Sequence, residues 1–230
     1  MTKKGKFIVI DGTDGSGKAT QVALLMKRLK KEGYKVKSVD FPEYENNFFG
    51  KFIGHCLTEQ YYNFVKVHPK IASVLYAADR FESKNTIEKW LKEGYVVVAN
   101  RYVSANQIHQ GGKIKNAAKR QEFITWLDAM EYGVFKLPQP TVVFYLDLPI
   151  AISRKLIRER NQNSSRSYQG SKKDVHEKDV NFLENSRRSA LWLATTQKNF
   201  VKIDCADKNT ILPRADIHAM VYKKVKRIIK

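Results

Sequence analysis

The fold of this chain is decided by the stretch KFIVIDGTDGSGKAT, residues 6–20. Residues 6–11 are mostly apolar and β-branched and end at a glycine, which predicts a buried strand. A glycine-rich loop then leads into Lys18, and apolar residues at helical spacing continue to residue 32. Between a strand and a helix, such a loop turns backbone N–H groups inward around phosphate oxygens, and the helix N-terminus adds partial positive charge. The stretch therefore predicts a P-loop that binds a nucleoside triphosphate.

The rest of the chain alternates short apolar runs with longer helical patterns. Further strands are predicted at 35–41, 95–100, 141–148 and 199–204, and helices at 18–32, 47–57, 69–92 (with a break near Asn85), 103–109, 115–132, 149–160, 175–197 and 214–229. This alternation implies a parallel sheet covered by helices on both faces. We therefore expect an α/β, three-layer P-loop NTPase fold with a five-stranded parallel sheet. One domain should span residues 1–230, with a mobile lid inserted at about 154–173.

The composition limits the possible partners. The chain carries 42 Lys+Arg against 23 Asp+Glu, a net charge of +19, which implies an anionic partner without choosing between nucleotide, nucleic acid and acidic membrane. No apolar run reaches the roughly 18 residues of a membrane span, and the N-terminus has no signal-peptide cleavage pattern. The two cysteines, Cys56 and Cys205, lack metal or redox spacing and are expected to be buried, reduced thiols. A cytoplasmic protein without a membrane partner is expected.

The P-loop departs from its usual pattern at one position. Lys18 would bridge the β- and γ-phosphates. The usual serine or threonine after this lysine is replaced by Ala19, which removes the usual loop ligand of Mg²⁺, and Thr20 would point elsewhere on the helix. The predicted triphosphate site comprises Gly12, Thr13, Asp14, Gly15, Ser16, Gly17, Lys18, Ala19 and Thr20.

Further motifs follow the P-loop in a specific order. They are FPEY (41–44), VLYAADRF (74–81), NRY (100–102), SANQIHQGG (104–112), LDLP (146–149), DVHE (174–177) and FLE (182–184). Together they resemble the motifs of the thymidylate kinases, and the resemblance covers almost the whole chain. It implies transfer of the γ-phosphoryl group of ATP to dTMP, with Mg²⁺ as cofactor. It also implies a homodimer, for which helices 69–92 and 115–132 could supply the interface.

The resemblance also implies the acceptor site. Arg80, a planar fork of donors, would hold the dTMP 5′-phosphate; the alternative is a surface arginine paired with Glu82 or Asp79. Tyr76, one helical turn earlier, would stack on thymine, the alternative being ordinary core packing. Asn106 would hydrogen-bond the pyrimidine, and Asp14 would contact the sugar 3′-OH. The implied dTMP-binding residues are Asp14, Phe41, Pro42, Tyr44, Tyr76, Arg80, Arg101, Asn106 and Gln110.

Arginines are expected to carry the phosphoryl transfer. Arg101 follows a strand at the edge where open α/β sheets bind ligands, and in the family this arginine bridges the donor and acceptor phosphates. The P-loop has no arginine, so the lid must supply the second one. The predicted catalytic residues are Lys18, Arg101, Arg158 and Arg160, with Arg154 and Arg166 as alternative lid arginines.

Three residues depart from the family pattern. Asn100 replaces an aspartate and Ala19 a serine or threonine, so two possible metal contacts are lost. His109 replaces a tyrosine that helps to exclude ribonucleotides, and we assign it no catalytic role. The acids left for Mg²⁺, directly or through water, are Asp11 and Glu177, and one or two carboxylates suffice for this ion.

Two alternative functions stay open. One is a kinase for another (deoxy)nucleoside monophosphate, because the motifs do not prove a preference for the 5-methyl group. The other is a catalytically inactive nucleotide-binding protein associated with nucleic acid, which the net charge and Asn100 favour. The presence of Arg80 and Arg101 argues against the second alternative, so a nucleic-acid partner is not expected.

Overall fold

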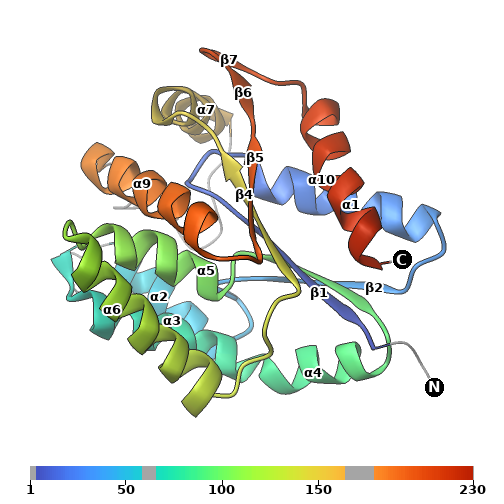
Figure 1. The fold of residues 1–230 in the computed structure, drawn as a ribbon, viewed down its shortest axis with the longest axis horizontal. Helices are drawn as coiled ribbons and strands as arrows, with labels where there is room; N and C mark the ends of the chain where they lie inside the picture. Colours follow the sequence, from blue (N-terminus) through green and yellow to red (C-terminus); the bar gives the residue numbers. More distant parts are fainter. Residues whose placement is uncertain (1–3, 59–65, 164–178, 230) are drawn as a thin grey trace.

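A computed structural model describes residues 4–58, 66–163 and 179–229 of the chain. Its centre is a five-stranded sheet in the order β2-β3-β1-β4-β5 (Figure 1). The strands are β1 (Lys6–Asp11), β2 (Val36–Asp40), β3 (Val96–Asn100), β4 (Val142–Asp147) and β5 (Phe200–Asp204). Every neighbouring pair runs parallel, so the expected α/β fold with a five-stranded parallel sheet is confirmed.

The helices follow the predicted order with local differences. They are α1 (Lys18–Lys31), α2 (Phe48–Leu57), α3 (Pro69–Glu82), α4 (Lys84–Lys92), α5 (Val103–Ala105), α6 (Ala117–Asp128), α7 (Ile150–Asn163), α9 (Val180–Thr196) and α10 (Arg214–Ile229), with π-helical turns η2 (Asn106–Gln110) and η3 (Ala129–Val134). The predicted break in 69–92 falls at Ser83. The hairpin of β6 (Ala206–Asp207) and β7 (Thr210–Ile211) was not predicted, because strands this short carry no apolar alternation.

Alternating side chains of the buried strands build two cores, one on each face of the sheet. In β1, Phe7 and Val9 pack with residues of α4, α6 and α9. Ile8 and Ile10 point to the other face and pack with α1 and α10, which Figure 1 shows on the side of the sheet opposite α6. Each fully buried side chain of this kind contributes about 1.5–3 kcal/mol, so the two cores fix the sheet firmly between its helices.

This rigid sheet positions the site at its carboxyl edge. In a parallel sheet all strands end at the same edge, and here β1 ends at Asp11, β3 at Asn100 and β4 at Asp147. The P-loop follows β1 directly, and Arg101 follows β3. Cys56 and Cys205 are both buried, as predicted. Within residues 4–58, 66–163 and 179–229, no helix is long and apolar enough to cross a membrane.

Candidate functional site

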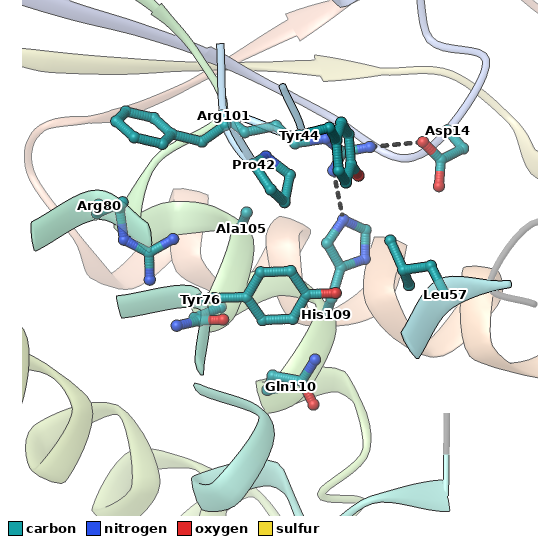
Figure 2. A pocket seen from close by; sticks show the side chains of 12 residues that line it. Asp14, Pro42, Tyr44, Leu57, Tyr76, Arg80, Arg101, Ala105, His109 and Gln110 are labelled. Carbon is teal, nitrogen blue, oxygen red and sulfur yellow. Dashed lines mark hydrogen bonds and ion pairs between the residues drawn. The ribbon is translucent and has the colours of Figure 1, made fainter. Parts of the chain in front are cut away.

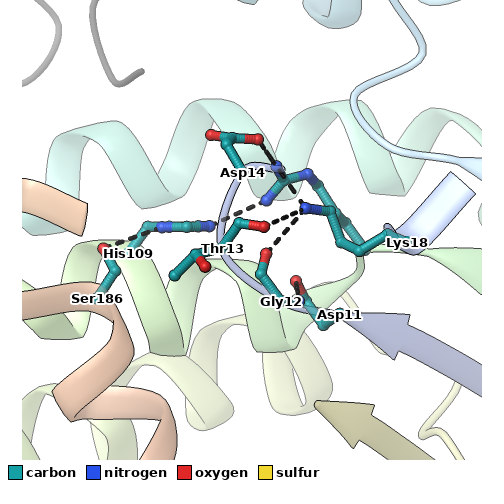
Figure 3. A network of polar contacts seen from close by, with 8 residues as sticks. Asp11, Gly12, Thr13, Asp14, Lys18, His109 and Ser186 are labelled. Carbon is teal, nitrogen blue, oxygen red and sulfur yellow. Dashed lines mark hydrogen bonds and ion pairs between the residues drawn. The ribbon is translucent and has the colours of Figure 1, made fainter. Parts of the chain in front are cut away.

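The P-loop curls around the ammonium group of its own lysine. Gly15 and Gly17 have φ angles of 79° and 88°, in the left-handed region that glycine adopts without strain. The loop thereby turns two carbonyl oxygens inward, and Lys18 Nζ donates to those of Gly12 and Thr13 at 2.9 Å each (Figure 3). A buried cation therefore lies at the centre of the loop, where phosphate oxygens would bind.

Asp11, the last residue of β1, connects the start of the P-loop to α5. It is fully buried, and its two carboxylate oxygens accept hydrogen bonds from the Gly12 N–H at 2.8 Å and from Ser104 Oγ at 2.6 Å. Burial raises the pKa of Asp11, although the charges of Arg101 and Lys18 oppose the shift. Its metal contact stays a prediction, and the other predicted metal residue, Glu177, lies outside the described residues. Among the residues that are described, no three His, Cys, Asp or Glu side chains form a metal cluster.

A cavity beside the P-loop brings the predicted acceptor residues together (Figure 2). Its lining contains Asp14, Phe41, Pro42, Tyr44, Tyr76, Arg80, Arg101, Asn106 and Gln110, and also Leu57, Ala105 and His109. These residues come from the P-loop, from the segments that follow β2 and β3, and from α2, α3, α5 and η2. Sequence motifs therefore predicted residues that share one cavity, while the group that each residue binds stays a prediction.

Arg101 connects this cavity to the P-loop. Its backbone φ is 65°, an unusual value for a non-glycine residue that costs roughly 1–2 kcal/mol. Its N–H donates to the Ile10 carbonyl at 3.0 Å, which anchors the turn after β3 to β1. The guanidinium donates through Nη2 to Asp14 Oδ1 at 2.5 Å and lies 2.9 Å from His109 Nε2 through Nη1. A single cation thus contacts the P-loop and lines the cavity beside it.

His109 holds Arg101 from the other side. A guanidinium only donates, so His109 Nε2 must accept and the imidazole must be neutral with its proton on Nδ1. Nδ1 lies 3.0 Å from Ser186 Oγ (Figure 3). This hydroxyl donates its own hydrogen to the Phe182 carbonyl at 2.7 Å. The imidazole also stacks on the Phe182 ring at 5.7 Å. The sequence indicated no catalytic role for His109 and no role for Ser186, since no motif indicates a contact between η2 and α9.

Arg80 is buried rather than on the surface. Only 2% of it is exposed, and it donates to the Glu131 carboxylate from Nε at 2.7 Å and from Nη2 at 2.6 Å. Burial lowers the pKa of Arg80, but the ion pair with Glu131 outweighs it and raises the pKa overall. The alternative of a surface arginine paired with Glu82 or Asp79 is therefore wrong, because η3 places Glu131 directly against it. Arg80 and Asp14 lie at opposite ends of the cavity in Figure 2.

Gln110 lines the cavity with a side-chain amide that makes no hydrogen bond to the described residues. It is fully buried, and neither its Nε2 nor its Oε1 has a hydrogen-bond partner among the described residues. A buried amide left without partners costs about 1–3 kcal/mol for each group, a cost that hydrogen bonds to a ligand would remove. Tyr76 is half-buried on the same cavity wall. Both side chains are thus placed to contact a bound molecule.

Much of the predicted lid lies beyond the described residues. Arg158 is exposed on α7 and Arg154 is half-buried, whereas the side chain of Arg160 and the whole of Arg166 fall outside the described part. No sequence motif indicated Arg187 of α9, which donates to both carboxylate oxygens of Asp147 at 2.7 and 3.1 Å. This pair fastens α9 to the carboxyl end of β4, next to the site.

Comparisons with known proteins agree with the motifs. The family model "Thymidylate kinase" matches residues 10–215. A thymidylate kinase of Thermosipho melanesiensis is 28% identical over 86% of this chain and 88% of its own length. A probable thymidylate kinase of Pyrobaculum aerophilum is 29% identical over 97% of this chain and 98% of its own length. The solved structure of a Candida albicans thymidylate kinase superposes with a TM-score of 0.70 at 20% identity, covering 97% of this chain and 92% of that one.

Proposed function

The chain belongs to the thymidylate kinase family, and we propose that the cavity beside its P-loop is the site that binds dTMP. The chain transfers the γ-phosphoryl group of ATP to dTMP, which gives dTDP and ADP. The position of Arg101 is the main support for this assignment. Its side chain lines the cavity while its guanidinium contacts Asp14 of the P-loop. A cation in this place can touch the phosphates of both substrates.

The two ends of the cavity fix the orientation of dTMP. In-line transfer requires the acceptor phosphate to approach the γ-phosphate, so the dTMP phosphate must lie at the P-loop end, beside Arg101. The base then extends toward Arg80, with Tyr76 between the two ends (Figure 2). Arg80 suits the base better than the phosphate, because Glu131 already neutralises its charge. We therefore assign Arg80 to the base, whereas the motif resemblance alone implied the phosphate.

Catalysis in this arrangement would rest on positioning and on neutralisation of charge. Phosphoryl transfer needs little covalent help from the protein, so no carboxylate base is required. Lys18 would neutralise the β- and γ-phosphates, and Arg101 the transferring group. Arg158 and Arg160 of the lid would neutralise further negative charge in the transition state. Gln110, whose amide is buried without a partner, would contact the bound acceptor.

The donor set near the P-loop fits Mg²⁺. Asn100 Oδ1 and Ser16 Oγ are buried oxygens without a hydrogen-bond partner among the described residues. Asn100 lines a surface hollow together with Gly17 and Lys18, so its oxygen lies near the expected phosphates. Oxygen atoms are the ligands that Mg²⁺ prefers, and the ion usually keeps several waters. Asn100 and Ser16 would hold the ion directly or through water, and its chemistry there would be to neutralise phosphate charge.

A homodimer would cover an apolar surface on α3. Ile71, Val74 and Phe81 are 60%, 41% and 50% exposed, and Val134 of η3 is 73% exposed. Monomeric proteins rarely leave several large apolar side chains exposed on neighbouring elements, so a second copy of the chain is the proposed occupant. A cytoplasmic location suits a nucleotide kinase.

The test is an ADP-release assay with ATP, Mg²⁺ and a panel of acceptors. The panel contains dTMP, dUMP, the ribose form of TMP, dGMP and thymidine. We expect turnover to prefer dTMP. Absence of ADP release with every acceptor, in a protein that still binds ATP, would refute the kinase assignment and favour the inactive nucleotide-binding alternative.

Two arginine variants test the role of Arg101. Arg101→Ala should lower kcat/KM for dTMP at least 100-fold, because removal of one preorganised charge contact typically costs this much. Arg188→Ala is the matched control, because Arg188 is an exposed arginine of α9 that bonds only to the Asn185 side chain among the contacts described. Equal activity in the two variants would contradict the site assignment.

A further inference from the structure

Three polar side chains from distant segments meet at the Arg80 end of the acceptor cavity. Glu131, from η3, is fully buried and accepts hydrogen bonds from Arg80 of α3 and from Asn106 Nδ2 of η2, the latter at 2.9 Å. We propose that Glu131 is the positioning residue that sets the hydrogen-bond polarity of the base site. Through its two partners, it would select a pyrimidine with a 4-oxo group and an N3–H. This inference rests on the proposed function.

The orientation of Asn106 follows from its partners. Its Nδ2 lies 2.9 Å from Glu131 Oε1 and 3.1 Å from the Ser73 carbonyl oxygen. A carboxylate and a carbonyl only accept, so the amide nitrogen must face both of them. Oδ1 is therefore the amide atom left for the cavity that Asn106 lines. Glu131 and Ser73 thus make Asn106 an acceptor toward the ligand.

Arg80 supplies the complementary donor. A guanidinium has five N–H groups and no acceptor. Two of them bind Glu131, and Nη1 donates one more to the Tyr102 carbonyl at 3.3 Å. The remaining N–H groups can only donate. Since Arg80 lines the cavity beside Asn106, the base site offers a donor next to an acceptor.

This pattern fits one class of pyrimidine. Thymine and uracil present an N3–H donor and an O4 acceptor, which match Asn106 Oδ1 and an Arg80 N–H. Cytosine presents an N3 acceptor and an N4 amino donor. Cytosine would place acceptor against acceptor and donor against donor, and a buried site built for hydrogen bonds rejects such a ligand strongly. The pattern does not read the 5-methyl group, so it selects dTMP and dUMP alike against dCMP.

Without its charge, Glu131 could not enforce this pattern. In Glu131→Gln, one of the two side-chain atoms facing Arg80 and Asn106 becomes an N–H₂ donor that confronts other donors. Only the Ser73 carbonyl would then hold the Asn106 amide in its orientation, so the preference for Oδ1 facing the cavity would weaken. The bidentate hold on Arg80 would also be lost. Both changes would weaken the reading of the 4-oxo group without touching the ATP site.

The test measures selectivity in the complete chain. We expect the wild type to favour dTMP and dUMP over dCMP at least about 100-fold in kcat/KM, and Glu131→Gln to reduce this ratio at least tenfold. KM for dTMP should change more than kcat, and KM for ATP should stay within twofold. Glu122→Gln is the matched control, because it removes the same charge from an exposed position of α6 and should leave the ratio unchanged.

The possible outcomes separate this inference from the proposed function. A folded Glu131→Gln with wild-type selectivity overturns the role of Glu131, while dTMP turnover by the wild type leaves the kinase assignment intact. If the wild type phosphorylates no nucleoside monophosphate, the proposed function itself fails. If Glu131→Gln does not fold, Glu131→Asp decides, because its shorter carboxylate keeps the charge but cannot span both partners. Selectivity that stays at the wild-type value in Glu131→Asp would also overturn the inference.

Discussion

Replacing His109 with phenylalanine isolates the hydrogen bond that positions Arg101. The ring of His109→Phe would keep the stack on Phe182, where the centroids lie 5.7 Å apart. It would lose the acceptor that lies 2.9 Å from Arg101 Nη1. Ser186 would keep its hydrogen bond to the Phe182 carbonyl, so the fold should survive with little loss of stability.

The magnitude follows from the charge on Arg101. A hydrogen bond to a charged group contributes about 1.5–3 kcal/mol. If Arg101 needs this bond to stay in place during phosphoryl transfer, the loss corresponds to a fall in kcat/KM for dTMP of about 10- to 150-fold. The variant should lose activity rather than stability, because Asp14 still accepts a hydrogen bond from Arg101 Nη2.

The assay is steady-state ADP release at saturating ATP with dTMP varied, together with a thermal melt of each variant. Ser186→Ala is the control, since it removes the partner of Nδ1 but leaves the imidazole beside Arg101. It should lower kcat/KM by less than tenfold. A His109→Phe variant with a normal melt and a kcat/KM within twofold of wild type would refute the positioning role.

Three further predictions concern stability, assembly and the P-loop. Burial raises the pKa of Asp79 from 3.8 to about 6, so the favourable contribution of this carboxyl is present below pH 3.8 and is lost as pH rises through 6. The difference in unfolding free energy between Asp79→Asn and wild type, measured by urea titration, should therefore shift by about 1–3 kcal/mol in favour of the variant from pH 4 to pH 8. A difference that is the same at both pH values would contradict this. Ile71→Asp should shift a dimer to monomer in sedimentation, whereas Ile211→Asp on the β6–β7 hairpin should not, and a monomeric wild type would dismiss the proposed interface. Gly15→Ala should raise KM for ATP at least tenfold, because Gly15 has φ 79° and an added Cβ would lie 2.6 Å from the Ser153 carbonyl; unchanged ATP binding would show that the loop tolerates the strain.

The sequence alone determined the sheet and the P-loop because both depend on local patterns. Short apolar, β-branched runs predicted all five strands of the parallel sheet, and the strand–glycine–lysine–helix order predicted the phosphate loop. The acceptor residues were also predicted, since their motifs end strands or begin helices that must meet at the carboxyl edge. The π-helical turns and the β6–β7 hairpin were not, because they interrupt the regular periods on which such predictions depend.

Only the tertiary structure decided the partners of the buried charges. Near Arg80, the sequence offered Asp79 and Glu82 as neighbours, yet the packing of η3 against α3 pairs Arg80 with Glu131. His109 lies in the motif of residues 104–112, which does not indicate its contacts. Only the packing of α9 on η2 places it between Arg101 and Ser186. Most buried polar groups have a hydrogen-bond partner within about 3 Å, and which side chain lies there depends on how distant helices pack rather than on neighbours along the chain.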